Sequence, residues 1–197
     1  EDVFVPTHRR LMFSDVMSGN SPGYRASGKP LYSIPMFAGI PTAITSPALG
    51  ALQGAIDAFI ETTSLKTTRG IQSGDRAAGF AAVQSAVATA CAAVDSGRLM
   101  FLRDLEEIHA AADAGQEITH NIRIRNRLTQ GYLMKQAVTA IDELYNVTGV
   151  TGTNIGNRVE RAWRDIHAMS HHIMLNWPVV SSMCGRHLLG LDPQGRY

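Results

Sequence analysis

The chain has 197 residues, enough for one main domain with a sizeable core. Its formal net charge is +1 and 18% of its residues are charged, so it lacks the broad positive field used to bind nucleic acids or membrane surfaces. Two distant cysteines, Cys91 and Cys184, fit buried thiols in a reducing cytoplasm better than a disulfide framework. No stretch of 18 uninterrupted apolar residues indicates a membrane span, and the start of the chain does not resemble a signal peptide.

The first 36 residues read as the end of one domain followed by a loop. Residues 3–5 are Val-Phe-Val and precede Pro6, a pattern typical of the last strand of a sheet. A lone strand cannot stabilise itself, so the pattern predicts a fragment whose sheet lies upstream. Glycine, serine and proline over residues 17–35 indicate a loop. We therefore assign 1–36 to the closing strand and loop of a β-domain, and 37–197 to a helical domain.

Apolar residues at spacings of three and four predict four long helices after this loop. The expected spans are 37–63, 75–114, 117–146 and 157–176, with a shorter fifth helix at 178–189. The second span is rich in alanine, which lets neighbouring helices approach closely. The connections are short, polar and rich in glycine and threonine. The predicted fold class is therefore all-α, an antiparallel four-helix bundle.

The stretch from Asn157 to Asn176 carries most of the polar residues of interest. As one helix it has a single apolar stripe, formed by Val159, Trp163, Ile166, Met169 and Ile173. Its polar residues fall on two faces, with Arg158, Arg161, Asp165 and His172 on one and Glu160, Arg164, His167 and His171 on the other. The four-residue spacing of Arg161 and Asp165 favours a structural ion pair. Arg158 suits either a phosphate contact or solvent.

His167 and His171 form an H-x3-H pair, which is compatible with a metal ion on one helical face. The pair lacks the adjacent glutamate of H-E-x-x-H, and the paired Glu-x-x-His motifs of bundle di-iron sites have no match in the chain. We therefore predict no metal site. The turn at residues 149–154 reads Gly-Val-Thr-Gly-Thr-Asn and offers backbone N–H groups at a helix N-terminus, which suits an anion. An ordinary connection between two helices is the alternative.

The block W-R-D-I-H-A-M-S-H-H and the later N-W-P-V-V-S-S-M-C-G-R-H-L-L-G resemble the C-terminal helical domain of flavin-dependent monooxygenases with the acyl-CoA dehydrogenase fold. These are the oxygenase components of two-component aromatic hydroxylases. In that family an Arg-Asp pair precedes, by seven residues from the Asp, a His that faces the flavin and the substrate. Here the pair is Arg164-Asp165 and the His is His172. The opening V-F-V-P is similar to the end of the family's middle β-domain.

The resemblance implies a homotetrameric enzyme of aromatic catabolism that receives reduced FMN or FAD from a separate flavin reductase. With O2 as co-substrate, such an enzyme hydroxylates a small phenolic compound through a flavin C4a-hydroperoxide. His172 is the implied catalytic residue, orienting the substrate or stabilising the oxygenated flavin. The implied flavin contacts are the loop residues Thr151, Gly152 and Asn154, often reaching a neighbouring subunit's flavin, together with Arg158. Lys66 and Arg69 lie in the connection between the first two long helices, where related folds approach a cofactor phosphate, but they match the family's motif there poorly.

Phe37 and Met174 are candidates for lining an aromatic pocket, although their residue types favour the core. An acyl-CoA dehydrogenase is the alternative enzyme. It is disfavoured because residues 173–175 are Ile-Met-Leu where that family places its catalytic glutamate. A catalytic base elsewhere in the bundle would restore the dehydrogenase alternative. A non-catalytic helical oligomerisation module is the non-enzyme alternative. The sequence leaves open the substrate, FMN versus FAD, and whether carbon, nitrogen or sulfur is oxidised.

Overall fold

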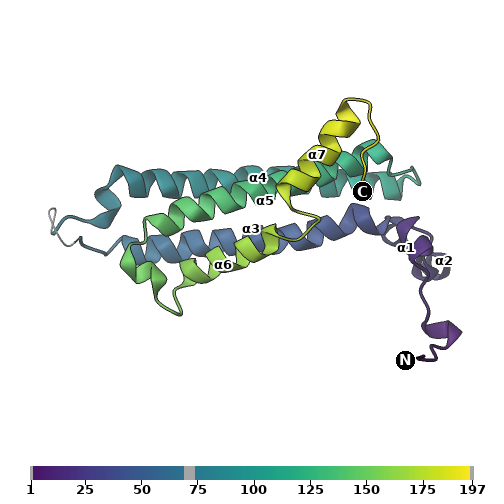
Figure 1. The fold of residues 1–197 in the computed structure, drawn as a ribbon, viewed down its shortest axis with the longest axis horizontal. Coiled ribbons are helices and arrows are strands. Elements are labelled where there is room, and N and C mark those ends of the chain that lie inside the picture. Colours follow the sequence, from purple (N-terminus) through teal and green to yellow (C-terminus); the bar gives the residue numbers. More distant parts are fainter. Residues whose placement is uncertain (1, 69–73, 196–197) are drawn as a thin grey trace.

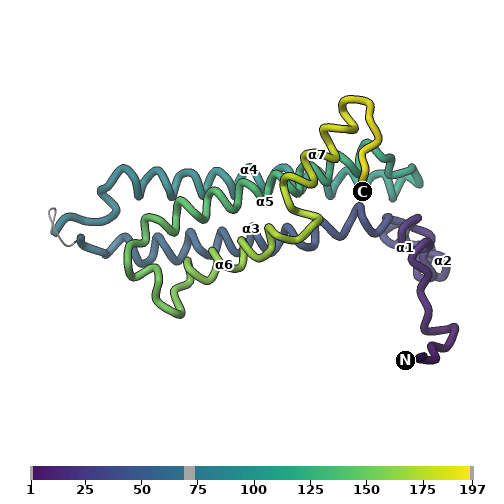
Figure 2. The backbone as a smooth tube through the Cα atoms, viewed as in Figure 1, coloured from purple at the N-terminus to yellow at the C-terminus, as the bar shows by residue number. Residues whose placement is uncertain are grey.

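The computed structural model describes residues 2–68 and 74–195, and over these residues its regular structure is helical (Figure 1). The α-helices are α1 (Phe13–Met17), α2 (Pro22–Ser27), α3 (Met36–Thr63), α4 (Ala81–Asp113), α5 (His120–Asn146), α6 (Arg158–Ser170) and α7 (Trp177–Leu188). Helices α3 to α6 run alternately up and down the long axis, and α7 packs across α5 (Figure 2). The predicted all-α antiparallel bundle is therefore confirmed.

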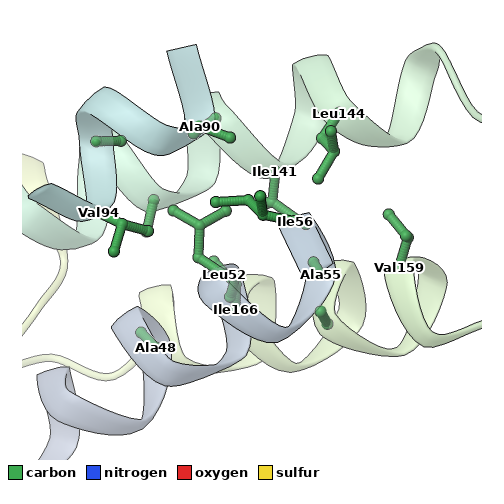
Figure 3. Packing of buried hydrophobic residues seen from close by; sticks show 14 of the residues in the cluster. Ala48, Leu52, Ala55, Ile56, Ala90, Val94, Ile141, Leu144, Val159 and Ile166 are labelled. Carbon is green, nitrogen blue, oxygen red and sulfur yellow. The ribbon is translucent and has the colours of Figure 1, made fainter. Parts of the chain in front are cut away.

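The core lies between α3, α4, α5 and α6, each of which contributes a stripe of buried side chains (Figure 3). Its centre is formed by Ala48, Leu52, Ala55, Ile56, Ala90, Val94, Ile141, Leu144, Val159 and Ile166. Alanines lie where helices approach one another, and the larger aliphatic side chains fill the space between them. Full burial of one such aliphatic side chain contributes about 1.5–3 kcal/mol, so this core is the main source of stability.

Helix α3 continues through Pro41 and Pro47, although proline lacks the amide proton that a helix interior uses. The hydroxyl of Ser46 lies 3.5 Å from the carbonyl oxygen of Ala43, the group that Pro47 leaves without a backbone donor. Within the described residues, α3 is also the helix that is long and apolar enough to cross a membrane, and 44% of that window is buried in the bundle. Core helices share this composition, so it carries no membrane assignment.

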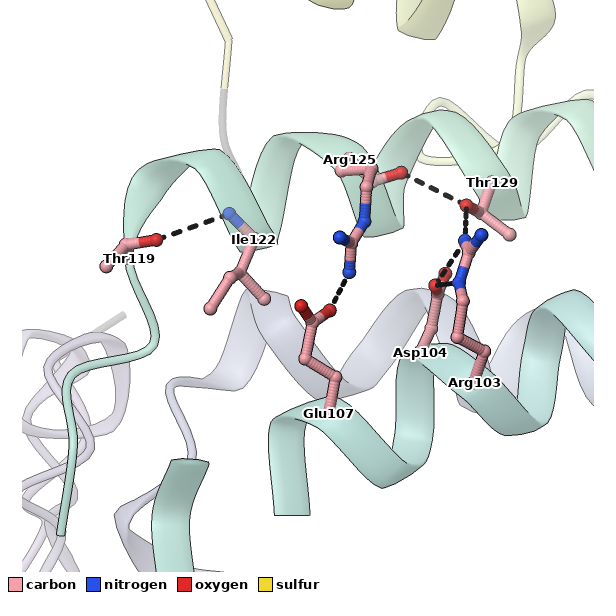
Figure 4. Close-up of polar contacts among 7 residues, drawn as sticks. All are labelled: Arg103, Asp104, Glu107, Thr119, Ile122, Arg125 and Thr129. Atoms are coloured by element: carbon pink, nitrogen blue, oxygen red, sulfur yellow. Dashed lines mark hydrogen bonds and ion pairs between the residues drawn. The ribbon is translucent and has the colours of Figure 1, made fainter. Parts of the chain in front are cut away.

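Polar contacts join α4 to α5 near the turn between them (Figure 4). Nη2 of Arg103 donates to Oδ1 of Asp104 at 2.7 Å and to Oγ1 of Thr129 at 3.1 Å. Arg125 pairs with Glu107 across the same two helices. Asp104 is 1% exposed, and its pairing with a guanidinium offsets the cost of burying a carboxylate.

The expected strand at residues 3–5 is not formed, because no strand among the described residues lies beside it and its side chains are exposed. The expected loop at 17–35 contains α2, which starts with Ser21 as N-cap and Pro22 in its first turn. Helix α4 begins at Ala81, later than expected, because residues 77–79 form a separate 3-10 turn.

The helix predicted from Asn157 to Asn176 was too long. Helix α6 ends at Ser170, and residues 171–175 form a turn before α7. The backbone N–H of Met174 donates to Nδ1 of His172 at 3.2 Å, in place of the carbonyl four residues back that a helix would use. As a result Ile173, expected on the apolar stripe, is 69% exposed.

Candidate functional site

His172 lies in the turn between α6 and α7, with an exposed side chain. Its carbonyl oxygen accepts the backbone N–H groups of Leu175 at 2.8 Å and Asn176 at 3.0 Å, which closes the turn. Because Nδ1 accepts the N–H of Met174, the proton of a neutral imidazole is on Nε2. The turn therefore presents His172 with Nε2–H as a hydrogen-bond donor for a ligand.

A pocket of about 460 Å³ opens beside this turn. The start of α3, the first third of α5, the His172 turn, α7 and the C-terminal segment all contribute to its wall. Its lining consists of Phe37, Arg127, His172, Ile173, Met174, Val179, Met183, Gln194 and Gly195. This volume falls in the range of small-molecule sites, and most of the lining is apolar. The three residues that the sequence offered for catalysis and substrate contact, Phe37, His172 and Met174, are brought together here.

Arg127 is the residue of this pocket that sequence reasoning missed. It is 5% exposed, and its Nη1 donates to the carbonyl oxygen of Met174 at 2.6 Å. The guanidinium thus holds the same turn that carries His172. Gly131 and Met134, four and seven positions later on α5, are buried too, and this spacing was the available sequence signal for an inward-facing arginine.

A second pocket of about 330 Å³ lies at the other end of α6. Lys66 lines it, and its Nζ donates to the carbonyl oxygen of Thr148 at 2.8 Å and contacts Oγ1 of Thr151 at 3.3 Å. Asn154 lines it as well. The structure therefore joins two of the predicted loop residues to the lysine whose sequence match was poor. One ammonium group with several hydroxyl and amide groups suits a phosphate or another anion.

The other predicted cofactor residues have different surroundings. Gly152 is buried, and a Cβ at this position would lie 1.8 Å from Oγ1 of Thr148, so the glycine lets the side chain of Thr148 pack against the backbone of the 3-10 turn. Arg158 does not line the pocket and pairs with Glu61 at 3.4 Å, both side chains being exposed. Arg69 lies outside the described residues.

The remaining polar residues of α6 make structural contacts. Arg161 and Asp165 form the predicted pair at 3.7 Å, and both are exposed. The ring of His167 packs at a tilt against Trp163, with ring centroids 4.4 Å apart, and its Nε2 lies 3.4 Å from Oδ1 of Asp142. His171 is exposed in the turn, so the two histidines of the H-x3-H pair have separate environments.

The two pockets lie at opposite ends of α6, which spans about 18 Å at 1.5 Å per residue. Within one copy of the chain, Thr151 and Asn154 therefore do not share a pocket with His172. The apolar pocket can hold an aromatic ring beside an imidazole and a guanidinium. The polar pocket can hold an anionic group.

The sequence pattern of the family described as acyl-CoA dehydrogenase, C-terminal domain, matches residues 42–177. The oxygenase component of an FADH2-dependent resorcinol hydroxylase from Rhizobium sp. (strain MTP-10005) is 37% identical over all of this chain and 50% of its own length. The oxygenase subunit HsaA of a flavin-dependent monooxygenase from Rhodococcus jostii (strain RHA1) is 32% identical over 87% of this chain and 45% of its own.

A solved structure, the 3-HSA hydroxylase from Rhodococcus sp. RHA1, superimposes with a TM-score of 0.87 at 30% identity. The match covers 98% of this chain and 49% of that one. The chain thus spans about half the length of the relatives it matches. The expected resemblance to the helical half of flavin-dependent oxygenase components is confirmed.

Proposed function

Because the chain belongs to the acyl-CoA dehydrogenase C-terminal domain family, we propose that it is the helical half of the oxygenase component of a two-component, reduced-flavin-dependent aromatic hydroxylase. The convergence of Phe37, His172 and Met174 on one largely apolar pocket is the observation that carries the proposal. None of the described residues lining that pocket is a carboxylate, which disfavours the α-proton abstraction of a dehydrogenase at this place.

In this scheme the pocket holds the aromatic substrate. Phe37 and Met174 contact the ring and exclude water, and His172 donates Nε2–H to an oxygen of the substrate or of the oxygenated cofactor. Bound reduced flavin would supply the oxygen activation, by the C4a-hydroperoxide route that the resemblance implies. The identity of the substrate and of the oxidised atom lies beyond these contacts.

The polar pocket fits the anionic part of a flavin nucleotide, because Lys66 supplies a positive charge and Thr151 and Asn154 supply hydrogen-bonding groups. Because it lies far from His172 within one copy, this loop would serve a neighbouring subunit's flavin, FMN or FAD, in the homotetramer that the resemblance implies. A separate flavin reductase would supply that flavin. We place the enzyme in the cytoplasm, where free thiols such as Cys91 and Cys184 persist.

The test uses the full-length protein that contains this chain. Reduced FMN or reduced FAD is bound without oxygen, the complex is mixed with oxygenated buffer, and flavin absorbance and hydroxylated phenol are recorded. We expect a long-lived oxygenated flavin and coupled product in the wild type. His172→Ala should lower product per flavin oxidised by at least about ten-fold, as loss of a positioned donor does.

His171→Ala is the matched control, because His171 is exposed in the same turn and does not line the pocket. It should leave coupling unchanged. Failure to bind either reduced flavin, or immediate reoxidation without product in the wild type, would overturn the oxygenase proposal and favour the oligomerisation module.

A further inference from the structure

Arg127 is a buried cation without an acidic partner among the described residues. The residue is 5% exposed. Nearby Arg103 and Arg125 each form an ion pair, but Arg127 takes part in none of the ion pairs of the described residues. Its Nε is sealed from solvent and has no hydrogen-bond partner. A buried charge is costly unless an opposite charge compensates it, so this guanidinium lacks a counter-ion that its position calls for.

Arg127 does not avoid the need for a counter-ion by losing its proton. Burial lowers the pKa of Arg127 to about 10, which still leaves the group protonated at neutral pH. The one hydrogen bond that it makes in the described chain, from Nη1 to the carbonyl oxygen of Met174, satisfies a donor without neutralising the charge. Nη2 makes no hydrogen bond in this part of the chain and is not among the sealed atoms, so it remains for a ligand.

The pocket defines the ligand's chemistry. Besides Arg127, its titratable lining residue is His172, whose Nδ1 is occupied by the N–H of Met174 and whose Nε2–H is a donor. The pocket thus combines a cation and a donor with walls formed by Phe37, Met174 and other apolar side chains. An ionised oxygen on an aromatic ring matches this combination, because the oxygen meets the charge and the ring meets the walls.

We propose that Arg127 is the anion-binding residue of the His172 pocket and that the ligand is an aromatic oxyanion, a carboxylate or a phenolate. The aromatic part of this inference rests on the proposed function; the anionic part rests on the uncompensated guanidinium. The bond from Arg127 to Met174 also fixes the bound charge relative to His172. An anion held at Arg127 therefore sets which ring position meets the oxidant.

The test measures equilibrium binding to the full-length protein in the absence of oxygen. Benzoate and its neutral counterpart benzamide form one arm, and 4-nitrophenol, whose phenolate absorbs differently from the phenol, forms the other. A preference for benzoate over benzamide of about ten- to a hundred-fold, the size of one charge-assisted bond, indicates a carboxylate site. A phenolate site is indicated when bound 4-nitrophenol absorbs as the anion below the pH at which the free compound ionises.

The variants are Arg127→Met, which removes the charge, and Arg127→Lys, which keeps it. Arg125→Met is the matched control, because it removes a charge two residues away on the same helix and outside the pocket. Arg127→Met should abolish the preference for the anion, Arg127→Lys should retain part of it, and Arg125→Met all of it. If Arg127→Met does not fold, the inference is tested by the anion preference of the wild type and by its partial retention in Arg127→Lys.

Absence of any anion preference in the wild type, or its survival in Arg127→Met, overturns the inference; the arginine then pairs with a carboxylate elsewhere in the assembled protein. The two proposals fail separately. Coupled hydroxylation without an anion preference would sink this inference alone, whereas an anion preference without oxygenation would sink the proposed function alone.

Discussion

The indole Nε1 of Trp163 on α6 donates a 2.7 Å hydrogen bond to Oδ1 of Asp142 on α5. The indole also stacks on Tyr145, with ring centroids 5.3 Å apart, and packs against the tilted ring of His167. Helix α6 is thereby fixed to α5 by a polar contact and by ring packing at the same residue. Because α6 leads directly into the His172 turn, this contact supports the geometry of the candidate site.

Trp163→Phe should therefore destabilise the protein. The substitution keeps an aromatic ring against Tyr145 but leaves Asp142 without the indole donor, and loss of one such hydrogen bond costs about 1 kcal/mol. The measurement is urea denaturation of the full-length protein followed by circular dichroism. Arg161→Met is the control, because Arg161 is 78% exposed on the same helix and should change stability by less than about 0.5 kcal/mol. Equal stability of Trp163→Phe and wild type would contradict this role.

Gly131 on α5 permits the close approach of α7. A Cβ at this position would lie 2.9 Å from Cγ1 of Val180, which is fully buried. Gly131→Ala should lower the free energy of unfolding by about 1–3 kcal/mol through overpacking. Adding Val180→Ala should recover part of that loss, because the smaller side chain makes room for the new methyl group.

Gly54→Ala is the control for helix propensity, since a Cβ at Gly54 has no atom within 4 Å. In the interior of α3 it should raise stability by up to about 1 kcal/mol. A Gly131→Ala protein as stable as the Gly54→Ala protein would show that α7 moves freely away from α5.

The long helices were predictable because each buries one periodic stripe. Leu52, Ile56 and Phe59 recur at the spacing of a single helical face, and all three lie in the core. The end of α6 was not predictable in this way. The N–H of Met174 donates to the side chain of His172, which competes with a helical backbone carbonyl for this donor. Hydrophobic periodicity carries no information about such a side-chain hydrogen bond.

Part of the site could be predicted from the sequence. His172 was found through its spacing from Asp165 in the family resemblance, Phe37 and Met174 were candidates for an aromatic pocket, and the structure places all three around one pocket. Arg127 was missed because arginine on a helix is ordinarily solvent-exposed. The spacing on α5 places it on the same face as Gly131 and Met134, but its full burial also needs the His172 turn and α7 to fold back over α5, which is tertiary packing.

Asn157 is the N-cap of α6, and its Oδ1 accepts the backbone N–H groups of Val159 at 2.8 Å and Glu160 at 3.3 Å. Its Nδ2 also donates to the carbonyl oxygen of Thr151 at 3.2 Å. Asn157→Ala should cost about 1 kcal/mol by removing the cap. Asn157→Asp should keep the cap but lose the bond to Thr151.

Hydrogen exchange resolves these two effects. In Asn157→Ala the amides of the first turn of α6 should exchange faster, whereas in Asn157→Asp only residues 150–153, the 3-10 turn that contains Thr151, should do so. Unchanged exchange in both variants would mean that neighbouring contacts alone hold the loop beside Lys66.

The two cysteines should differ in reactivity. Cys184 on α7 is 4% exposed, and burial raises the pKa of its thiol; Cys91 on α4 is half-buried. Alkylation consumes the thiolate, so near neutral pH the folded protein should be labelled by iodoacetamide faster at Cys91. Peptide mass spectrometry measures the two rates, and denaturation in concentrated urea should make them equal. If the raised pKa of Cys184 slows its labelling, the ratio of the two labelling rates should approach one as the pH rises. If only steric exclusion slows it, the ratio should stay constant. Equal rates in the folded protein would contradict the burial of Cys184 and the packing of α7 against α5.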